Sequence, residues 1–231
     1  MKIKLENIGK RFNADWIFRG INAEFQSKSS YAILGANGSG KSTLLQIIAG
    51  AVSPSEGSLE YFLFPGVNRS DISTKKNENQ NSALPSLEPE KIFSHLSLAA
   101  PYLDFPEEMT LNELVKFHFC FKSPVKGMSQ KQIIETLELE SAKGKQIKYF
   151  SSGMKQRVRL GLAILSNTAI LLLDEPASHL DKNGIEWYRK LMTEYSGERL
   201  VVVCSNHQEK EYDFCLPHLL TLKEPSRLTT E

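Results

Sequence analysis

Gly35-Ala-Asn-Gly-Ser-Gly-Lys41-Ser42-Thr43 is the stretch that decides how this chain folds. It fits the pattern G-x-x-x-x-G-K-[ST], in which a glycine-rich turn joins a strand to a helix. The short apolar run at residues 31–34 precedes it, and residues 41–49 follow with leucines and isoleucines at helical spacing. The stretch therefore predicts a tight loop between a buried strand and an amphipathic helix.

Such a loop has the chemistry of a phosphate-binding site. Its glycines let successive backbone N–H groups point at phosphate oxygens, and the following helix adds the positive end of its dipole. Lys41 supplies a catalytic charge for the β- and γ-phosphates, and the Ser42 hydroxyl is a ligand for Mg²⁺. A glycine-rich turn that merely opens a helix is the alternative, which the flanking strand and helix disfavour. The expected nucleotide-binding residues are Gly35, Asn37, Gly38, Ser39, Gly40, Lys41, Ser42 and Thr43.

A second apolar strand, residues 170–173, ends in two acids, Asp174 and Glu175. Asp174, at the strand tip, is placed to hold Mg²⁺ through its water shell. Glu175 is placed to accept a proton from the attacking water as a general base. Acids often follow buried strands as simple caps, but the phosphate loop upstream favours the metal interpretation.

Strand and helix patterns alternate along the rest of the chain. Strands are expected at residues 2–8, 17–25, 58–64 and 200–204, and helices at 110–122, 129–139 and from 151 onward. Thr110 and Glu113 have the spacing of a capping box. The alternation predicts an α/β fold with a mainly parallel sheet. We expect residues 1–231 to form one domain, with an exposed, flexible loop at about 66–90, where polar residues dominate.

The bulk composition excludes several classes of function. Hydrophobic residues make up 41% of the 231 residues and charged residues 24%, enough for a packed core. The net charge of +1 gives no reason to expect a nucleic-acid partner. The strongest apolar runs fall far short of the about 20 residues of a membrane-spanning helix, and the N-terminus lacks a signal region. We expect a cytoplasmic protein with reduced cysteines, which another chain would have to hold at any membrane.

Residues 150–157, Phe-Ser-Ser-Gly-Met-Lys-Gln-Arg, resemble the signature of the ABC ATPase family, usually Leu-Ser-Gly-Gly-Gln followed by a basic helix. As in that family, they lie just ahead of the strand that ends at Asp174. Residues 176–181 resemble the family's D-loop, and His207 follows a strand at the position of its switch histidine. The ordered motifs resemble the family over about residues 2–222.

The resemblance implies a fold and a two-chain mechanism. The fold would be a P-loop NTPase core with an N-terminal antiparallel β subdomain and an α-helical subdomain at about 95–167. Two subunits, as a homodimer or pseudo-homodimer, would pack head to tail. ATP and Mg²⁺ would lie between the phosphate loop of one subunit and Ser151, Ser152 and Gly153 of the other.

The resemblance also assigns roles to three further residues, His207, Asp181 and Phe12. His207 would contact the γ-phosphate and help to position Glu175 and the water, as a catalytic residue. Asp181 of the D-loop is counted with the nucleotide-binding residues. Phe12 lies where the family places an aromatic that stacks on adenine, with Trp16 and Phe18 as nearby alternatives.

The chain departs from the family pattern in two places. The signature has Ser152 where Gly is usual and Met154 where Gln is usual. The family also expects a Gln before the helical subdomain that contacts Mg²⁺ and water. No Gln occurs from residue 91 to 110, and the best-aligned positions are Ala100 and Pro101.

Three functions compete at this stage. The first is the ATP-hydrolysing subunit of a multi-chain ABC transporter, peripheral on the inner face of the membrane through separate transmembrane permease subunits, with a slight lean toward export. The second is a soluble ABC ATPase without a membrane partner, such as a cofactor-assembly ATPase. The third is a non-hydrolysing nucleotide-binding regulator, against which Glu175 and His207 argue.

Overall fold

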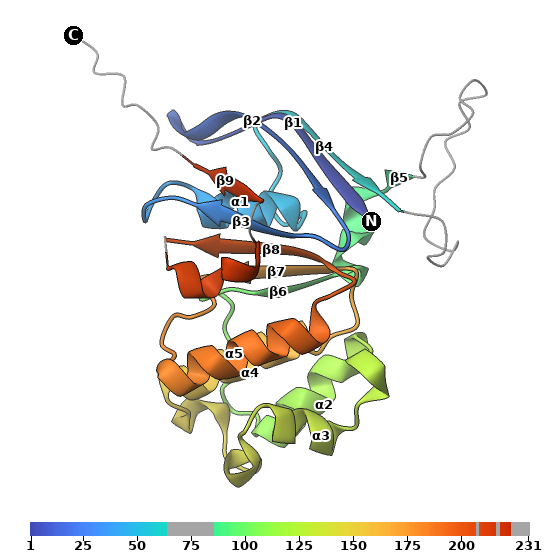
Figure 1. Ribbon diagram of the computed structural model, residues 1–231, viewed down its shortest axis with the longest axis vertical. Coiled ribbons are helices and arrows are strands. Elements are labelled where there is room, and N and C mark those ends of the chain that lie inside the picture. Colours follow the sequence, from blue (N-terminus) through green and yellow to red (C-terminus); the bar gives the residue numbers. More distant parts are fainter. Residues whose placement is uncertain (64–85, 207, 216–217, 223–231) are drawn as a thin grey trace.

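A computed structural model describes residues 1–63, 86–206, 208–215 and 218–222. Two β-sheets and a layer of helices stack along the long axis of the molecule (Figure 1). The described part contains no helix that is both long and apolar enough to cross a bilayer.

The first sheet is antiparallel, with strand order β2-β1-β4-β5. Its strands are β1 (Lys2–Phe12), β2 (Asp15–Gln26), β4 (Glu56–Phe62) and β5 (Ser86–Leu87). Alternate residues of β1, such as Ile3 and Leu5, are buried while their neighbours are half-buried or exposed. This period of two is the alternation that the sequence predicts. Residues 86–90, which composition had placed at the end of an exposed loop, form β5 and the start of a 3₁₀ helix, Pro89–Ser94.

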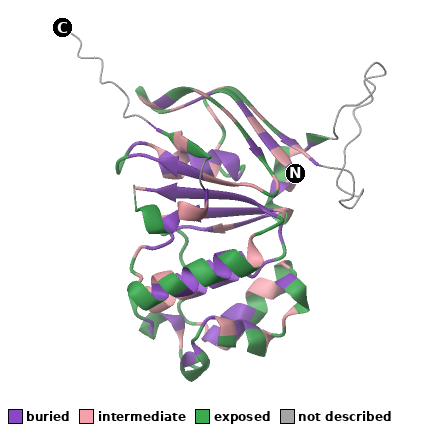
Figure 2. Cartoon of the chain, in the orientation of Figure 1, coloured by how far each residue is buried: buried purple, intermediate pink, exposed green. Residues whose placement is uncertain are grey.

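The second sheet is parallel, with strand order β6-β7-β8-β3-β9. Its strands are β6 (Leu96–Ala99), β7 (Ile170–Asp174), β8 (Leu200–Ser205), β3 (Ser30–Leu34) and β9 (Leu219–Thr221). Strands β7 and β8 are buried along their whole length, as expected of parallel strands covered on both faces. Figure 2 shows these strands as the buried centre of the molecule.

Each face of the parallel sheet belongs to a different core. Ile170 and Leu172 of β7 pack with helix α1 (Lys41–Ile48) and the antiparallel sheet. Leu171 and Leu173 point the other way, into the core formed with the helical layer. Helix α1 therefore lies between the two sheets (Figure 1), which fixes the loop at its N-terminus.

The helical layer contains α2 (Leu111–Phe121), α3 (Gln130–Thr136), α4 (Ser152–Ile164) and α5 (Lys182–Tyr195). Thr110 and Glu113 form the expected capping box at the start of α2. Short 3₁₀ helices at 125–127, 140–142 and 147–149 lie between the α-helices of this layer. Two more follow β8, at 209–211 and 213–215. Strand β6 lies within the range expected for the helical subdomain, yet it is part of the parallel sheet. The helical segment accordingly begins after Ala100.

Candidate nucleotide-binding site

The loop between β3 and α1 wraps tightly around a central ammonium group. Lys41 is 4% exposed, and its Nζ donates to the carbonyl oxygens of Gly35 and Ala36, both at 2.9 Å. These two bonds hold the positive charge at the floor of the loop. Ser39 is fully buried, and its Oγ has no hydrogen-bond partner in the described part. The loop thus presents a fixed cation and an unused hydroxyl donor, which suits an anion.

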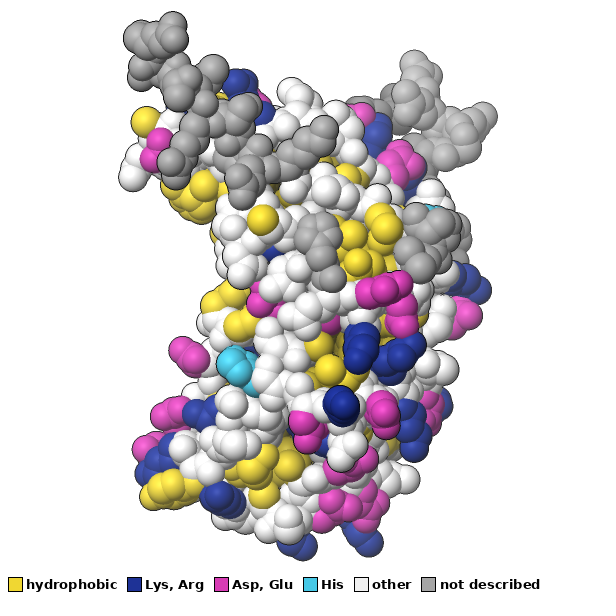
Figure 3. Space-filling view, turned by 60° about the vertical axis from the view of Figure 1, so that its left-hand side comes forward, with side chains coloured by type: hydrophobic (Ala, Val, Ile, Leu, Met, Phe, Trp, Pro, Cys, Tyr) yellow, Lys and Arg dark blue, Asp and Glu magenta, His cyan; other side chains and the backbone are white. Residues whose placement is uncertain are grey.

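A cavity of about 250 Å³ opens over this loop. Its described lining consists of loop and α1 residues together with Ile17 of β2 and Glu175, namely Ile17, Asn37, Gly38, Gly40, Lys41, Ser42, Thr43 and Glu175. Figure 3 turns this edge of the parallel sheet forward and shows the surface drawn in between the antiparallel sheet and the helical layer. Three elements distant in sequence therefore meet at one polar hollow.

Asp174 lies buried beneath this hollow, with 2% of its surface exposed. Burial raises the pKa of its carboxyl, while a hydrogen bond with Ser42 opposes the rise. Its Oδ1 has no hydrogen-bond partner in the described part. An uncompensated carboxylate oxygen beside a hydroxyl is a donor set that fits Mg²⁺.

The metal ion would need ligands beyond the protein. The described residues contain no group of three or more His, Cys, Asp or Glu able to hold a metal. Two protein oxygens, from Ser42 and Asp174, match a Mg²⁺ that completes its shell with phosphates and water.

Glu175 occupies a strained position at the end of β7. Its φ is 45°, in the left-handed region, and its N–H donates to the carbonyl of Cys204 on β8 at 2.9 Å. The Glu175 side chain is part of the cavity lining. Non-glycine residues with such a backbone are held by their surroundings, and they cluster at functional sites.

The end of β8 reaches the phosphate loop. Asn206 Nδ2 donates to Asn37 Oδ1 at 3.5 Å. The predicted switch histidine, His207, lies outside the described residues, so its role stays a prediction.

The signature residues stand apart from the cavity. Ser151 caps α4 by accepting a hydrogen bond from the N–H of Met154 at 3.2 Å. Ser151 and Ser152 are exposed, and the described lining of the cavity includes neither them nor Gly153. A Cβ added to Gly153 would come within 3.1 Å of the carbonyl of His179. The helix N-terminus that the resemblance assigns to ATP therefore lies outside the described lining of this chain's own cavity.

Two further predicted ligands have local roles in the structure. Asp181 caps α5 by accepting a hydrogen bond from the N–H of Gly184 at 2.7 Å. Phe12 is 50% exposed at the end of β1, where Lys10 Nζ lies 4.9 Å from the ring centroid. Phe18 is buried, and the Arg19 guanidinium covers Trp16 at 4.2 Å. Of the aromatics considered, Phe12 retains the most open ring, although Ile17 is the residue that lines the cavity.

Tyr102 is a candidate site residue that the sequence analysis did not identify. It lies next to Ala100 and Pro101, the positions that align best with the glutamine that this chain lacks. Ala100 is fully buried, but Tyr102, two residues later, hydrogen-bonds Gln46 of α1. Burial raises the pKa of Tyr102 to about 12, and the negative charge of Asp174 adds to the rise. A polar side chain from this segment therefore approaches α1, the helix that carries Ser42. The sequence signal was a hydroxyl-bearing residue next to the expected position.

The fold and the site together define a P-loop nucleotide-binding domain. Residues 18–178 match the family model for ABC transporters, and the chain belongs to this family. It is 24% identical over 205 residues to a lantibiotic transport ATP-binding protein of Streptococcus pyogenes, covering 89% of this chain and 80% of that protein.

Two further likenesses agree with this assignment. The chain is 30% identical over 218 residues to the sulfate/thiosulfate import ATP-binding protein of Mesostigma viride, covering 91% of this chain and 56% of that protein. A solved putative ABC transporter ATP-binding protein from Pyrococcus furiosus shares the fold, with a TM-score of 0.72 and 19% identity over 96% of this chain and 98% of that one. The predicted α/β P-loop fold with its antiparallel and helical parts is confirmed.

Proposed function

We propose that this chain binds ATP with Mg²⁺, hydrolyses it, and drives a transporter. The observation that carries the proposal is the meeting of Lys41, Ser42 and Glu175 around one cavity, with Asp174 buried below. A cation for phosphate, two oxygens for a metal and a carboxylate for water are the parts that phosphoryl transfer to water needs.

Each residue has a distinct task in this proposal. The loop N–H groups and Lys41 bind the phosphates and stabilise charge that develops on them. Ser42 and Asp174 would hold Mg²⁺, which when bound neutralises phosphate charge. The Glu175 carboxylate orients a water molecule for in-line attack on the γ-phosphorus and accepts its proton.

A second copy would complete the site. Ser151 at the start of α4 is exposed, and the described lining of the cavity does not include it. In a head-to-tail pair, the Ser151 turn of the partner would close over the γ-phosphate with its hydroxyl and helix N-terminus. Loss of that phosphate removes charge-assisted contacts, so hydrolysis reopens the pair.

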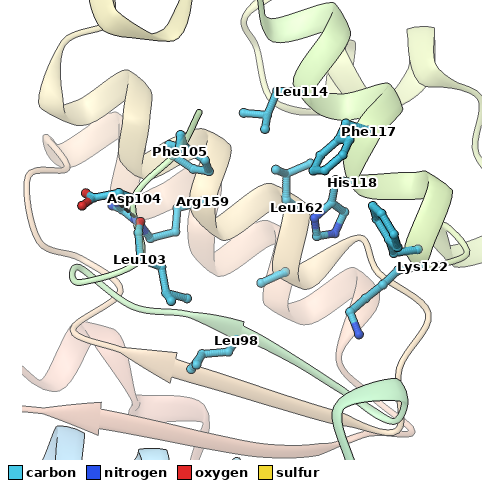
Figure 4. A pocket seen from close by; sticks show the side chains of 12 residues that line it. Leu98, Leu103, Asp104, Phe105, Leu114, Phe117, His118, Lys122, Arg159 and Leu162 are labelled. Atoms are coloured by element: carbon cyan, nitrogen blue, oxygen red, sulfur yellow. Dashed lines mark hydrogen bonds between the residues drawn. The ribbon is translucent and has the colours of Figure 1, made fainter. Parts of the chain in front are cut away.

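A groove in the helical part is the proposed docking place for a permease chain (Figure 4). It measures about 340 Å³ and lies among β6, α2 and α4. Phe117 and Phe121 are 46% and 75% exposed at its wall. Lys122 lies at one end, where its Nζ donates to the carbonyls of Phe93 and Leu96 at 2.8 Å. The groove suits a short amphipathic helix with an acidic residue near Lys122.

Glu175→Gln tests the hydrolytic part of the proposal. Because the amide cannot accept the proton, turnover should fall by about 10²–10⁴-fold while ATP still binds. The variant should form an ATP-dependent dimer that light scattering detects. Lys41→Ala is the matched control, which should lose ATP binding and the dimer. Unchanged turnover in Glu175→Gln would remove Glu175 from the role of base.

Crosslinking in cells tests the transporter part. A polytopic membrane protein crosslinked to the chain, and lost on Phe121→Asp, supports a peripheral subunit on a permease. The same variant should keep its ATPase rate, since Phe121 lies far from the phosphate loop in sequence and outside the lining of its cavity. Recovery of soluble assembly partners alone would favour an ABC ATPase without a membrane chain.

A further inference from the structure

A buried acid outside the known motifs links the two segments that flank the site. Glu211 has no exposed surface, although its neighbours Glu209 and Lys210 are exposed. It ends the 3₁₀ helix Glu209–Glu211, which follows β8. Burying a carboxylate costs free energy unless its oxygens are hydrogen-bonded. The hydrogen-bond partners of Glu211 therefore show what the buried carboxylate holds in place.

One carboxylate oxygen holds the turn that follows the general base. Glu211 Oε1 accepts a hydrogen bond from the backbone N–H of Ala177 at 2.9 Å. Ala177 lies two residues after Glu175, in the segment 176–181 that separates the base from α5. The bond therefore fixes the backbone immediately beyond the strained Glu175.

The other oxygen holds the end of β8. Ser205 Oγ donates to Glu211 Oε2, and the same hydroxyl accepts from the N–H of Gln208 at 3.1 Å. Ser205 lies two residues before His207. A single side chain thus bonds to both segments that leave the parallel sheet at the cavity edge.

The buried position of the Glu211 carboxylate carries an electrostatic cost. Burial raises the pKa of Glu211, and the negative charges of Glu175 and Asp174 raise it further. No salt bridge to Glu211 occurs in the described part of the chain. A third acid placed near Glu175 and Asp174 is unfavourable for stability alone.

We propose that Glu211 is a positioning residue that locks the Glu175 turn to the end of β8, so that the general base faces the γ-phosphate. The inference rests on the proposed ATP hydrolysis. Removal of the carboxylate frees the Glu175 turn without touching the phosphate loop. A base displaced by about 1 Å can lose up to about 100-fold in rate.

The test compares three single variants and one double variant by steady-state ATPase kinetics and by calorimetric MgATP binding. Glu211→Gln keeps the side-chain shape but loses an acceptor, and Ser205→Ala removes the other half of the same bond. Both should lower kcat about tenfold or more while KM and Kd change less than about twofold. Because they break one shared bond, the double variant should be no slower than the slower single variant.

Tyr188→Phe is the matched control. The Tyr188 hydroxyl donates to the backbone carbonyl of Glu211 at 3.0 Å, so this change perturbs the same residue but spares its carboxylate. It should lower the melting temperature and leave kcat unchanged. Wild-type kcat in Glu211→Gln and Ser205→Ala, or an equal loss in all three variants, overturns the inference. A wild-type protein that does not hydrolyse ATP overturns the proposed function instead.

Discussion

Gly40→Ala should destabilise the nucleotide-free protein much more than Gly38→Ala, although both glycines lie in the phosphate loop. Their backbones are alike, with φ of 94° and 84°. They differ in surroundings. A Cβ on Gly40 would lie 2.6 Å from Ile17 Cγ2 and 2.7 Å from Phe18 Cδ1, whereas a Cβ on Gly38 has no atom within 4 Å.

The expected free energies follow from two separate effects. A left-handed backbone costs an alanine about 1–2 kcal/mol, and reduced freedom of the unfolded chain returns about 0.4–1 kcal/mol. Gly38→Ala should therefore lose about 1 kcal/mol. Gly40→Ala adds overpacking against Ile17 and the buried Phe18, about 1–3 kcal/mol more. Its total loss should be about 3 kcal/mol.

Thermal denaturation without nucleotide measures the difference directly. In a chain of this size the melting temperature should fall by about 2–4 °C for Gly38→Ala and about 6–12 °C for Gly40→Ala. Equal losses would mean that the antiparallel sheet does not press on the loop through Ile17 and Phe18. The packing that positions the cavity would then be wrong.

Three other predictions concern the site. Asp174→Asn should stabilise the nucleotide-free protein at pH 7, because the folded-state pKa of Asp174 is raised and its charged form is unfavourable above it. The gain in unfolding free energy should shrink as pH falls and Asp174 becomes protonated, and a gain that grows would contradict the buried position. Phe12→Ala should weaken ATP binding about fivefold, as expected for loss of about 1 kcal/mol of stacking, and an unchanged Kd would assign the adenine to another surface. Tyr102→Phe loses the hydrogen bond to Gln46 of α1, so the unfolding free energy measured in urea should fall by about 1 kcal/mol. Unchanged stability would mean that Tyr102 does not hold its segment to α1.

Local patterns sufficed for much of the fold. The phosphate loop, the apolar β7 run and the Thr110 capping box each depend on neighbours in sequence, and each lies where the sequence predicts. Helix α5 was missed, although Trp187, Tyr188 and Leu191 give it a buried face. Its many charged residues dilute that pattern when it is viewed without the sheet it covers.

Contacts between segments that are distant in sequence could not be predicted from the sequence. Strand β1 pairs with β2 through several register shifts. A one-residue slip exchanges the faces of a strand, so sequence alone could not place Ile17 in the cavity lining. Glu211 lies in a short run of charged residues that predicts a solvated surface. Its burial depends on Ala177 and Ser205, which belong to other segments.

Helix α4 touches two separate regions of the molecule. Its first turn carries the exposed Ser151 cap, and its later residues Arg159 and Leu162 line the groove between β6 and α2. Thirteen residues at 1.5 Å each make a rod of about 20 Å. Gln156, in its middle, donates a hydrogen bond from Nε2 to the carbonyl of Pro176 at 2.9 Å. In the proposed transporter, a chain docked in the groove would therefore contact the same rigid helix whose other end carries Ser151, and a tilt of that helix would couple docking to closure of the pair without any contact with the nucleotide.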